Sequence, residues 1–464
     1  MNEQNTICAI STSPGMGAIA VIRLSGDKAI NITDHIFRSV VNGKKLSDQS
    51  ANSLHYGTIV NGDTIIDEVV VALFKAPHSY TGEDTVEISS HGSVVIQQSI
   101  LQLLIENGIR LAKPGEFTQR AFLNGKMDLS QAEAVADLIS ASSLAAHKMA
   151  LNQMRGGVST EIKTLRNQLL TFTSLVELEL DFSEEDVEFA NRTDLLQLCT
   201  NIHQLINKLA NSFEYGNSLK NGIPVAIIGD ANVGKSTLLN ALLNEEKAIV
   251  SEIAGTTRDV IEDVIIIDGI QFRFIDTAGI RTTTDTIENL GIERTFNKIK
   301  HAEIVLTLID ASRSFNDIIV FLTRMSDKLH EKKSALVINK IDLAESDTIE
   351  ELVRMGNEMQ FPTLTIAARN NTNIDQLISF LMDSVHNKGY TDNDVIITNV
   401  RHFESLRGAG IAIERVIDGL KTGISGDFLS QDIRECLYYL GEITGEISTD
   451  EVLGNIFKHF CIGK

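Results

Sequence analysis

The stretch Gly229-Asp230-Ala231-Asn232-Val233-Gly234-Lys235-Ser236 decides the fold of this chain of 464 residues. It fits the pattern G-x-x-x-x-G-K-[ST], with an apolar run at 224–228 before it and an apolar segment at 237–243 after it. A strand, a glycine-containing turn and a helix in this order form a loop whose backbone N–H groups surround a phosphate group, and the helix N-terminus adds positive partial charge. The stretch therefore predicts a phosphate-binding loop at the edge of a parallel sheet.

On the C-terminal side of this loop the chain alternates short apolar runs with amphipathic segments. The runs at 272–275, 303–308 and 335–338 have the length and composition of buried strands. Strands that alternate with helices predict a doubly wound parallel sheet. In this setting we expect Lys235 to reach the β- and γ-phosphates and Ser236 to ligate Mg²⁺.

Two further stretches, each after one of these runs, identify the nucleotide. Asp276-Thr277-Ala278-Gly279 places a carboxylate near the metal's water shell and a glycine where a γ-phosphate is sensed. Asn339-Lys340-Ile341-Asp342 offers a carboxylate to guanine N1–H and the 2-amino group, two donors that adenine cannot supply. A loop at 367–369 is expected to support the guanine oxygen through backbone N–H groups. The sequence therefore predicts a GTPase rather than an ATPase.

The residue that positions the attacking water is left open by these motifs. Ile280 follows the Asp-Thr-Ala-Gly stretch, where a Ras-like enzyme has a glutamine, and an isoleucine cannot hydrogen-bond to water. The acidic segment 284–293 offers Asp285, Glu288 and Glu293 as alternatives, and the spacing does not choose among them.

The positive charge that an arginine finger normally supplies also has several possible sources. Arg258 and Arg281 are candidates, and so is a monovalent cation held beside the phosphate loop by Asn232 and backbone carbonyls. The stretch 254–259 lies where a first switch loop belongs, so Thr257 is the expected second Mg²⁺ ligand.

The remainder of the chain predicts two other kinds of structure. Residues 1–125 mix β-branched runs with turns and one apolar helical stretch, which indicates an α+β domain. Residues 126–222 and 385–464 have a helical texture and flank the nucleotide-binding domain at 223–384. The simplest architecture is a multidomain α/β protein in which the nucleotide-binding domain is inserted between two halves of one helical domain.

Two local signals divide the first helical segment. Ser130-Gln131-Ala132-Glu133 has the spacing of a capping box, which predicts a helix N-terminus at Ser130. Gly156-Gly157 predicts a break between two helices.

Composition narrows the environment and the partners. No stretch reaches about 18–20 uninterrupted apolar residues, and the N-terminus has no basic region before an apolar run, so we expect a cytoplasmic protein without a membrane span. The 4 cysteines lie far apart, which disfavours a zinc site or a disulfide framework. A formal net charge of −21 disfavours general nucleic-acid binding, which needs cations against the phosphates, but it leaves room for a local basic surface or for a partner that presents the nucleic acid.

The whole chain resembles one family of bacterial proteins. The stretch Ala254-Gly255-Thr256-Thr257-Arg258-Asp259, the order of the domains and the C-terminal Phe460-Cys461-Ile462-Gly463-Lys464 are together similar to the MnmE (TrmE) family of tRNA-modification GTPases. The resemblance implies a homodimer that works with a flavin-binding partner, MnmG, to add aminomethyl or carboxymethylaminomethyl groups at C5 of the wobble uridine (U34) of tRNA. It also implies that K⁺ activates GTP hydrolysis, in place of an arginine finger, and promotes dimerisation of the nucleotide-binding domains.

The resemblance assigns residues within the nucleotide site as well. It aligns Glu288 with the glutamate that orients the attacking water, and Asn232, Ser251, Ile253 and Thr256 with the K⁺ ligands. The full set expected around GTP is Asn232, Val233, Gly234, Lys235, Ser236, Thr237, Ser251, Glu252, Ile253, Ala254, Gly255, Thr256, Thr257, Asp276, Thr277, Ala278, Gly279, Asn339, Lys340, Asp342, Ala367 and Ala368.

In the N-terminal domain the resemblance implies a site for a one-carbon tetrahydrofolate, in the 5-formyl or the methylene form. Arg23, Glu87 and Lys126 match the folate-contacting positions, with Lys464 nearby. An arginine–glutamate pair suits the amino-pyrimidine edge of a pterin, and a lysine suits its glutamate tail. Taken one at a time, such residues are more often members of surface ion pairs.

Cys461 is the last candidate residue. A buried structural thiol is the usual fate of a free cysteine, and the neighbouring Phe457 and Phe460 favour that role. Lys458, His459 and Lys464 favour the alternative, because nearby positive charge stabilises a reactive thiolate. The resemblance makes Cys461 a participant in the uridine chemistry and leaves its step open.

Two rival functions fit the nucleotide motifs equally well. A ribosome-assembly GTPase would need a basic RNA-binding module, and the C-terminal segment is neither basic nor patterned as alternating strands and helices. A purely regulatory GTPase would use its N-terminal domain for dimerisation alone.

Overall fold

The computed structural model describes residues 5–181, 192–243, 248–250, 263–275, 296–386, 394–424 and 426–463. By their contacts the residues form two compact units. The first comprises Met1–Ile139, Gln153–His203 and Gly408–Lys464, and the second comprises Ser140–Asn152 and Gln204–Arg407. Each unit combines segments that are distant in the sequence, and the domain boundaries expected at 125, 222 and 384 stay predictions. None of the helices in the described part of the chain has the length and apolar character needed to cross a membrane.

The first unit contains a sheet of 7 strands in the order β3-β4-β5-β6-β2-β1-β7. The strands are β1 (Ile7–Ile10), β2 (Ile19–Ser25), β3 (Phe37–Ser39), β4 (Ser53–Asn61), β5 (Thr64–Phe74), β6 (Thr85–His91) and β7 (Arg110–Leu111). Neighbouring strands run antiparallel except β1 and β7, which pair in parallel. This is the α+β arrangement that the β-branched runs predict.

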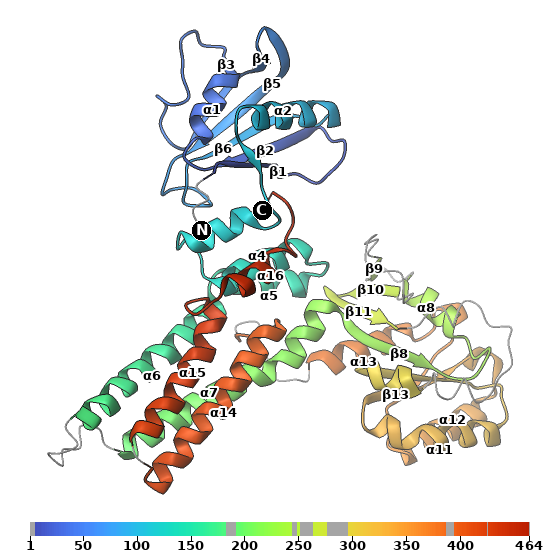
Figure 1. The fold of residues 1–464 in the computed structure, drawn as a ribbon. Helices are drawn as coiled ribbons and strands as arrows, with labels where there is room; N and C mark the ends of the chain where they lie inside the picture. The colour runs from blue at the N-terminus through green and yellow to red at the C-terminus, as the bar shows by residue number, and fades with distance from the viewer. Residues whose placement is uncertain are drawn as a thin grey trace. The chain divides into compact units, whose positions relative to one another are not determined.

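Side chains alternate between the two faces of this N-terminal sheet. Ile22, Leu24 and Ile88 are fully buried on one face, in a core that includes residues of α1 (Ala29–Ile36) and α2 (Val94–Glu106). Figure 1 shows both helices against the sheet. The apolar helical stretch expected in this region is α2.

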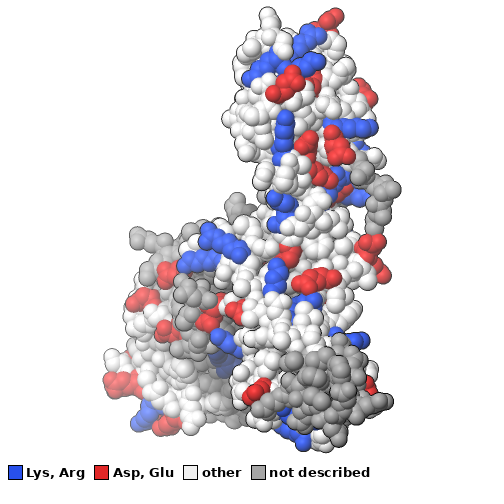
Figure 2. Space-filling model, turned by 90° about the vertical axis from the view of Figure 1, so that its left-hand side faces the viewer, with Lys and Arg blue, Asp and Glu red and all other residues white. Residues whose placement is uncertain are grey.

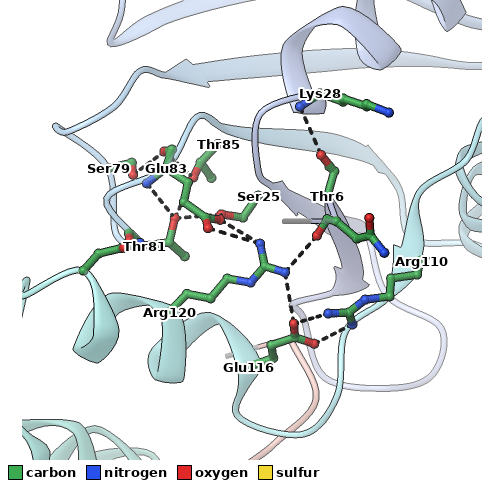
Figure 3. Close-up of polar contacts among 12 residues, drawn as sticks. Thr6, Ser25, Lys28, Ser79, Thr81, Glu83, Thr85, Arg110, Glu116 and Arg120 are labelled. Carbon is green, nitrogen blue, oxygen red and sulfur yellow. Dashed lines mark hydrogen bonds and ion pairs between the residues drawn. The ribbon is translucent and has the colours of Figure 1, made fainter. Parts of the chain in front are cut away.

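A buried ion network attaches α3 (Glu116–Leu123) to the N-terminal sheet (Figure 3). Arg120 donates to the two carboxylate oxygens of Glu83 at 2.9 and 3.2 Å and to Glu116 Oε1 at 3.0 Å. Arg110 donates to the two carboxylate oxygens of Glu116 at 2.5 and 2.8 Å. The side chains of Arg120 and Glu116 are only 10% and 8% exposed. Charges at this depth are tolerated when each one is paired and hydrogen-bonded, so the network joins α3 both to β7 and to the loop before β6.

Hydroxyl groups complete the network around Glu83. Ser25 Oγ donates to Glu83 Oε2 at 2.7 Å and lies 2.7 Å from Thr81 Oγ1, as Figure 3 shows. At the other end of the network, burial acts to raise the pKa of Glu116, but hydrogen bonds from Arg110, a backbone N–H and Arg120 outweigh it and lower that pKa below its ordinary value. The carboxylate of Glu116 is therefore held in its ionised form.

The first helix beyond α3 is α4 (Leu129–Ser140), and the helix N-terminus expected at Ser130 is wrong, because Ser130 lies inside α4 and is buried. Asp128 caps the helix instead. Its Oδ1 accepts the N–H of Gln131 at 3.1 Å, while Gln131 Oε1 accepts the N–H of Asp128 at 3.0 Å. These reciprocal bonds form a capping box two residues earlier, where an ionised carboxylate also interacts favourably with the helix dipole.

The break expected at Gly156-Gly157 is confirmed. The helix α5 (Leu144–Met154) ends before Gly156, which has a φ of +93°, and α6 (Gly157–Asp181) begins after it. A positive φ is the conformation in which glycine ends a helix at little steric cost.

The helical domain is discontinuous in the sequence, as expected. On α6, Arg166 donates to the backbone oxygen of Leu437 at 2.7 Å and pairs with Glu446 at 2.6 Å, although Leu437 lies 271 residues away on α15 (Gly426–Thr444). Three further helices of the described chain are α7 (Arg192–Asn221), α14 (Val400–Thr422) and α16 (Asp450–Phe457).

The second unit contains the other sheet of 7 strands, in the order β14-β13-β12-β8-β11-β10-β9. Its strands are β8 (Ile223–Ile228), β9 (Ala248–Val250), β10 (Asp263–Ile267), β11 (Ile270–Phe274), β12 (Ile304–Asp310), β13 (Lys333–Asn339) and β14 (Thr363–Thr365). The pairs from β14 through β11 are parallel, and β10 pairs antiparallel with β11 and β9. In the described part of this domain the α-helices are α8 (Lys235–Leu243), α11 (Phe315–His330), α12 (Ser346–Glu358) and α13 (Ile374–His386).

Both faces of this second sheet are buried. Along β8, Val225 and Ile227 lie in the core on one face, while Ala226 and Ile228 lie in the core on the other, and none is more than 3% exposed. A strand covered on both faces has no polar alternation, which is why the run at 224–228 is continuously apolar. The doubly wound parallel sheet expected from the sequence is therefore confirmed.

We expect Arg120→Met to destabilise the N-terminal sheet by about 3–5 kcal/mol, because Glu83 and Glu116 would lose the cation that they share. The measurement is the free energy of opening of β2 and β6 from native-state amide hydrogen exchange. The stabilisation that ionised Glu116 contributes should be complete above the ordinary pKa of the unfolded chain. It should be lost as the pH falls through the lowered pKa of the folded state.

The matched control for this experiment is Arg38→Met. Arg38 forms an exposed pair with Asp63 at 3.9 Å, and such pairs contribute about 0–1 kcal/mol. Equal losses in the two variants would show that the buried network does not hold α3 on the sheet.

Candidate functional site

The loop between β8 and α8 has the geometry of a phosphate-binding loop. Its two motif glycines have positive φ, +149° at Gly229 and +102° at Gly234. A Cβ on Gly229 would lie 2.2 Å from the backbone oxygen of Leu308, and one on Gly234 would lie 2.3 Å from Asn339 Nδ2. Both positions therefore accept only glycine, because the ends of the neighbouring strands β12 and β13 approach the loop this closely.

Lys235 begins α8 and turns back over this loop. Its Nζ donates to the backbone oxygens of Gly229 and Asp230 at 2.6 and 2.7 Å. Burial lowers the pKa of Lys235 to about 8, the positive charges of Lys298 and Arg313 add to the effect, and Asp230 opposes it. The ammonium group thus lies within the curve of the loop, where a nucleotide's terminal phosphates are bound.

Asn339 joins this phosphate loop to the loop expected at the base. Its Nδ2 donates to the backbone oxygen of Val233 at 2.8 Å, and its Oδ1 accepts the N–H of Ala368 at 3.0 Å. The side chain is buried, and both halves of its amide are satisfied. A single side chain therefore brings together the phosphate loop, the Asn339–Asp342 stretch and the loop at 367–369.

Lys340 adds a second connection of the same kind. Its Nζ donates to the backbone oxygen of Asn232 at 2.8 Å and to Asp310 Oδ2 at 2.6 Å. Burial acts to raise the pKa of Asp310, but hydrogen bonds from Lys340 and Ser312 outweigh it, so the pKa lies below its ordinary value. Lys340 itself has a φ of +63°, which turns the chain away from β13 into the 3-10 helix Ile341–Leu343.

The remaining predicted base contacts lie at the same edge of the sheet. Asp342 is exposed in that 3-10 helix, and one of its carboxylate oxygens accepts a hydrogen bond from Asn370 Nδ2 at 3.3 Å. Ala367 and Ala368 are buried, at the start of the 3-10 helix Ala368–Asn370. The exposed carboxylate and the backbone of the second loop are therefore positioned on one side of the phosphate loop.

The predicted metal ligands are only partly described. Ser236 and Thr237 are exposed at the N-terminus of α8, and Asn232 is exposed with a φ of +64°. Hydroxyl and amide oxygens are hard ligands that suit Mg²⁺ and K⁺, so the donor types fit both ions. The predicted site residues outside the described part of the chain are Ser251, Glu252, Ile253, Ala254, Gly255, Thr256, Thr257, Asp276, Thr277, Ala278, Gly279, Glu288 and Lys464.

A second cluster of predicted residues lies on the N-terminal sheet. Arg23 and Glu87 are paired across β2 and β6, and Arg23 Nε donates to Glu87 Oε1 at 2.8 Å. The guanidinium lies 5.5 Å from the ring centroid of Tyr80 and 5.7 Å from that of Phe117. Aromatic rings at this distance favour a cation and hold its plane in place. The pair is 19% and 27% exposed, so it remains accessible.

Lys126 and Cys461 lie in the same unit as this pair. Lys126 Nζ donates to the backbone oxygen of Pro77 at 3.0 Å, in the loop that also carries Tyr80. Cys461 is exposed, in contrast to the buried Cys8, Cys199 and Cys436. Of the two alternatives for this cysteine, the buried structural thiol is therefore contradicted, because Phe457 and Phe460 pack into the core beside α4 and leave Cys461 outside it.

Comparison with known proteins covers both sites. The family described as "GTP-binding protein TrmE N-terminus" matches residues 6–126, and "MnmE helical domain" matches residues 129–461. The tRNA modification GTPase MnmE of Bacteroides thetaiotaomicron is 58% identical over 100% of both chains. The proteins of that name from Parabacteroides distasonis and Flavobacterium johnsoniae are 56% and 51% identical, over at least 99% of this chain and 100% of each relative.

The chain belongs to the MnmE family. It is therefore a GTPase, and the fold expected for an MnmE-family protein is confirmed by an N-terminal domain, a helical domain and a Ras-like nucleotide-binding domain.

Two residues that contact the candidate nucleotide site were not predicted from the sequence. Arg313 donates to Asp230 Oδ2 at 2.9 Å and to the backbone oxygen of Ala231 at 2.6 Å, so it braces the phosphate loop from outside. Asp310 holds Lys340, as described above. The apolar run at 303–308 stops short of both residues, whereas β12 continues to Asp310. A carboxylate at the end of a buried strand beside two nucleotide motifs is the signal that could have found Asp310.

We expect GTP affinity to fall as the pH rises above about 8, by up to about tenfold per pH unit, because Lys235 without nucleotide has a pKa of about 8. The bound phosphates raise this pKa, so the complex keeps the proton that the free protein loses. Titration calorimetry with a non-hydrolysable GTP analogue across this range measures the effect.

The control variant is Lys235→Gln, which removes the titrating group. Its affinity should be lower and should vary little with pH above about 8. The same pH dependence in both proteins would assign the titration to a different group.

Proposed function

We propose that the protein hydrolyses GTP to support modification of the wobble uridine (U34) of tRNA, as the GTP-hydrolysing subunit of a complex that adds aminomethyl or carboxymethylaminomethyl groups at C5. The nucleotide half of this proposal is carried by Asn339, whose amide joins the phosphate loop to the two loops expected around guanine. The tRNA half is supported by identity along the whole chain to proteins named tRNA modification GTPases.

In the nucleotide site each described residue has a distinct task. Lys235 neutralises charge on the β- and γ-phosphates, and the N-terminus of α8 supplies N–H donors to the same groups. Asp342 accepts hydrogen bonds from guanine N1–H and the 2-amino group. Adenine has neither donor at this edge, so bound adenine would leave the Asp342 carboxylate unpaired and is rejected. The loop at 367–369 would lie beside the guanine oxygen, although the N–H groups of Ala367 and Ala368 already donate to the backbone oxygen of Thr372 at 3.2 Å and to Asn339 Oδ1 at 3.0 Å. Glu288 is proposed to orient the attacking water, a task that Ile280 cannot perform.

Mg²⁺ and K⁺ complete the proposed nucleotide site. Ser236 and Thr257 would hold Mg²⁺, and Asn232, Ser251, Ile253 and Thr256 would hold K⁺. The monovalent ion would supply the charge that an arginine finger supplies in other GTPases, and its enclosure would favour pairing of two nucleotide-binding domains. The positive φ of Asn232 and the hydrogen bond from Lys340 to its backbone oxygen fix the backbone from which its side chain extends, which supports a role as ligand.

The N-terminal sheet is the proposed site for a one-carbon tetrahydrofolate, which supplies a one-carbon unit when bound. Arg23 and Glu87 together offer donors and acceptors in one plane, which matches the amino-pyrimidine edge of a pterin. Tyr80 and Phe117 provide flat apolar surface beside them. Lys126 and Lys464 would contact the negatively charged glutamate tail.

The open face of the same sheet supports a homodimer. Arg23 and Glu87 face outward in one row of the sheet with Leu54, which is 72% exposed. In the adjacent row Tyr56 and Val70 are 51% and 38% exposed. Apolar side chains gathered on one sheet face mark a surface that a partner protein covers. We propose that a second copy of the chain covers it and lies close to the folate site.

The surface charge bears on how tRNA is bound. Figure 2 shows Lys and Arg interspersed with Asp and Glu on the face in view, without one continuous basic surface there. The net charge of the whole chain is −21. We therefore assign most of the tRNA phosphate contacts to the flavin-binding partner of the MnmG type, with local contacts from this chain.

The two rival functions have less support. Models of the MnmE family match residues 6–126 and 129–461 of this chain, which a ribosome-assembly GTPase would not require. A purely regulatory GTPase would have no use for an exposed cysteine beside the N-terminal domain.

We expect replacement of K⁺ by Na⁺ at equal ionic strength to slow GTP hydrolysis by about tenfold or more. Na⁺ has the same charge but is smaller, so it would not fit the proposed K⁺ site, and the positive charge of an arginine finger would not be replaced there. Steady-state phosphate release in the two salts measures the change. Asn232→Ala should bring the rate in K⁺ down to the rate in Na⁺. Equal rates of the unsubstituted protein in both salts would refute the cation mechanism.

We expect Cys461→Ser to abolish wobble-uridine modification and to leave GTP hydrolysis within about twofold of normal, because none of the residues proposed for the nucleotide site lies in the C-terminal segment. Mass spectrometry of tRNA nucleosides and phosphate release measure the two activities. Ile462→Ala is the matched control, since Ile462 is the next residue and is 62% exposed. Normal modified-nucleoside levels in the Cys461→Ser strain would remove the thiol from the mechanism.

A further inference from the structure

The C-terminal segment that carries Cys461 is seated on the end of β1. Ser11 Oγ donates to the backbone oxygen of Gly463 at 3.0 Å, although the two residues are 452 positions apart. Gly463 is buried and has a φ of +97°. A Cβ at Gly463 would lie 2.4 Å from the backbone oxygen of Ile10 and 3.0 Å from Ser11 Cα. The backbone of the segment therefore lies directly against β1, at a distance that only glycine allows.

A second contact holds the same segment at the start of α3. The N–H of Gly115 donates to the backbone oxygen of Cys461 at 3.3 Å. Gly115 has a φ of +66°, and a Cβ there would lie 2.8 Å from the backbone oxygen of Phe457 and 2.9 Å from Phe460 Cβ. Gly115 is thus a second position where only glycine fits, because the last turn of α16 lies directly against it.

Between these two contacts the side chain of Cys461 takes no part in holding the segment. Cys461 is exposed, and its backbone oxygen is the atom that Gly115 binds. The segment is anchored on one side by Phe457 and Phe460 in the core and on the other by buried Gly463. The place of the thiol is therefore determined by backbone fit, which leaves the sulfur available for chemistry.

The turn that binds the backbone of Cys461 leads into the part of α3 that lies beside Arg23. Phe117 lies two residues after Gly115, at the start of α3, and its ring centroid is 5.7 Å from the Arg23 guanidinium. The ion network of Glu116 and Arg120 fixes this start of α3 to the sheet. A displacement of the turn would therefore move the Cys461 backbone relative to Arg23, which Glu87 holds on the sheet.

We propose that Ser11, Gly115 and Gly463 are positioning residues that hold the thiol of Cys461 in register with the Arg23–Glu87 pair. The inference rests on the role in uridine modification that is proposed above for Cys461.

The test uses Gly463→Ala in the full-length protein, with Gly454→Ala as the matched control. Gly454 lies in α16, and a Cβ there would meet no heavy atom within 4 Å. In Gly463→Ala we expect amide exchange at Gly115 to become about tenfold faster or more, because its acceptor on Cys461 moves away. Wobble-uridine modification should fall by about tenfold or more, since small misplacements of a reacting group are costly, while GTP hydrolysis stays normal. Gly454→Ala should change none of these.

A milder pair of variants separates positioning from a general loss of structure. Ser11→Ala removes the hydroxyl donor and should speed Gly115 exchange and slow modification by about fivefold each. Ser11→Thr keeps the hydroxyl and should restore both. Unchanged Gly115 exchange in Gly463→Ala, or faster exchange with full modification, would overturn the proposal. If Cys461→Ser alone retains full modification, the proposed role of the thiol fails, and the exchange data still report whether the contacts hold the segment.

Discussion

The nucleotide-binding domain depends on how closely the carboxyl ends of three parallel strands approach one another. The phosphate loop after β8 packs so tightly against β12 and β13 that Gly229 and Gly234 have no room for a Cβ. The buried amide of Asn339 uses this proximity to bind one loop through its nitrogen and another through its oxygen. The loops proposed to bind the phosphates and the base are thereby joined in one frame, so that a displacement of one of the three loops would disturb the other two.

Charged groups brace this frame from outside. Lys340 connects Asp310 to the phosphate loop, and Arg313 connects Asp230 to the same loop. These contacts leave the ammonium of Lys235 facing the loop's own carbonyl groups, in a setting that lowers its pKa. Lys235 is already placed over the loop, so the proposed exchange of backbone oxygens for phosphate oxygens would not require the loop to assemble around it.

A comparable role belongs to the start of α3 in the first unit. Glu116 and Arg120 fix it to the sheet, Phe117 supports Arg23, and Gly115 receives the C-terminal segment. One turn of helix thus relates the candidate folate residues to the only exposed cysteine among the 4 in the chain. Since the ion network is buried, its geometry is set by packing as much as by charge. This suits the start of α3, which supports the candidate folate residues.

The sequence alone predicted the class of nucleotide, most of the strands and the helix break at Gly156, because each of these features depends on residues that are neighbours in the chain. A glycine-lysine turn indicates the phosphate loop, an apolar run indicates a buried strand, and a glycine that can adopt a positive φ ends a helix. The sequence placed the start of α4 wrongly at Ser130, because Asp128 caps that helix instead. The sequence also did not indicate Asp310 and Arg313, whose hydrogen-bond partners lie on other elements. Only the tertiary structure decided that Cys461 is exposed, since its burial depends on where α16 meets α4 and where Gly463 meets β1. Those contacts join residues hundreds of positions apart, and no pattern along the chain encodes such a distance.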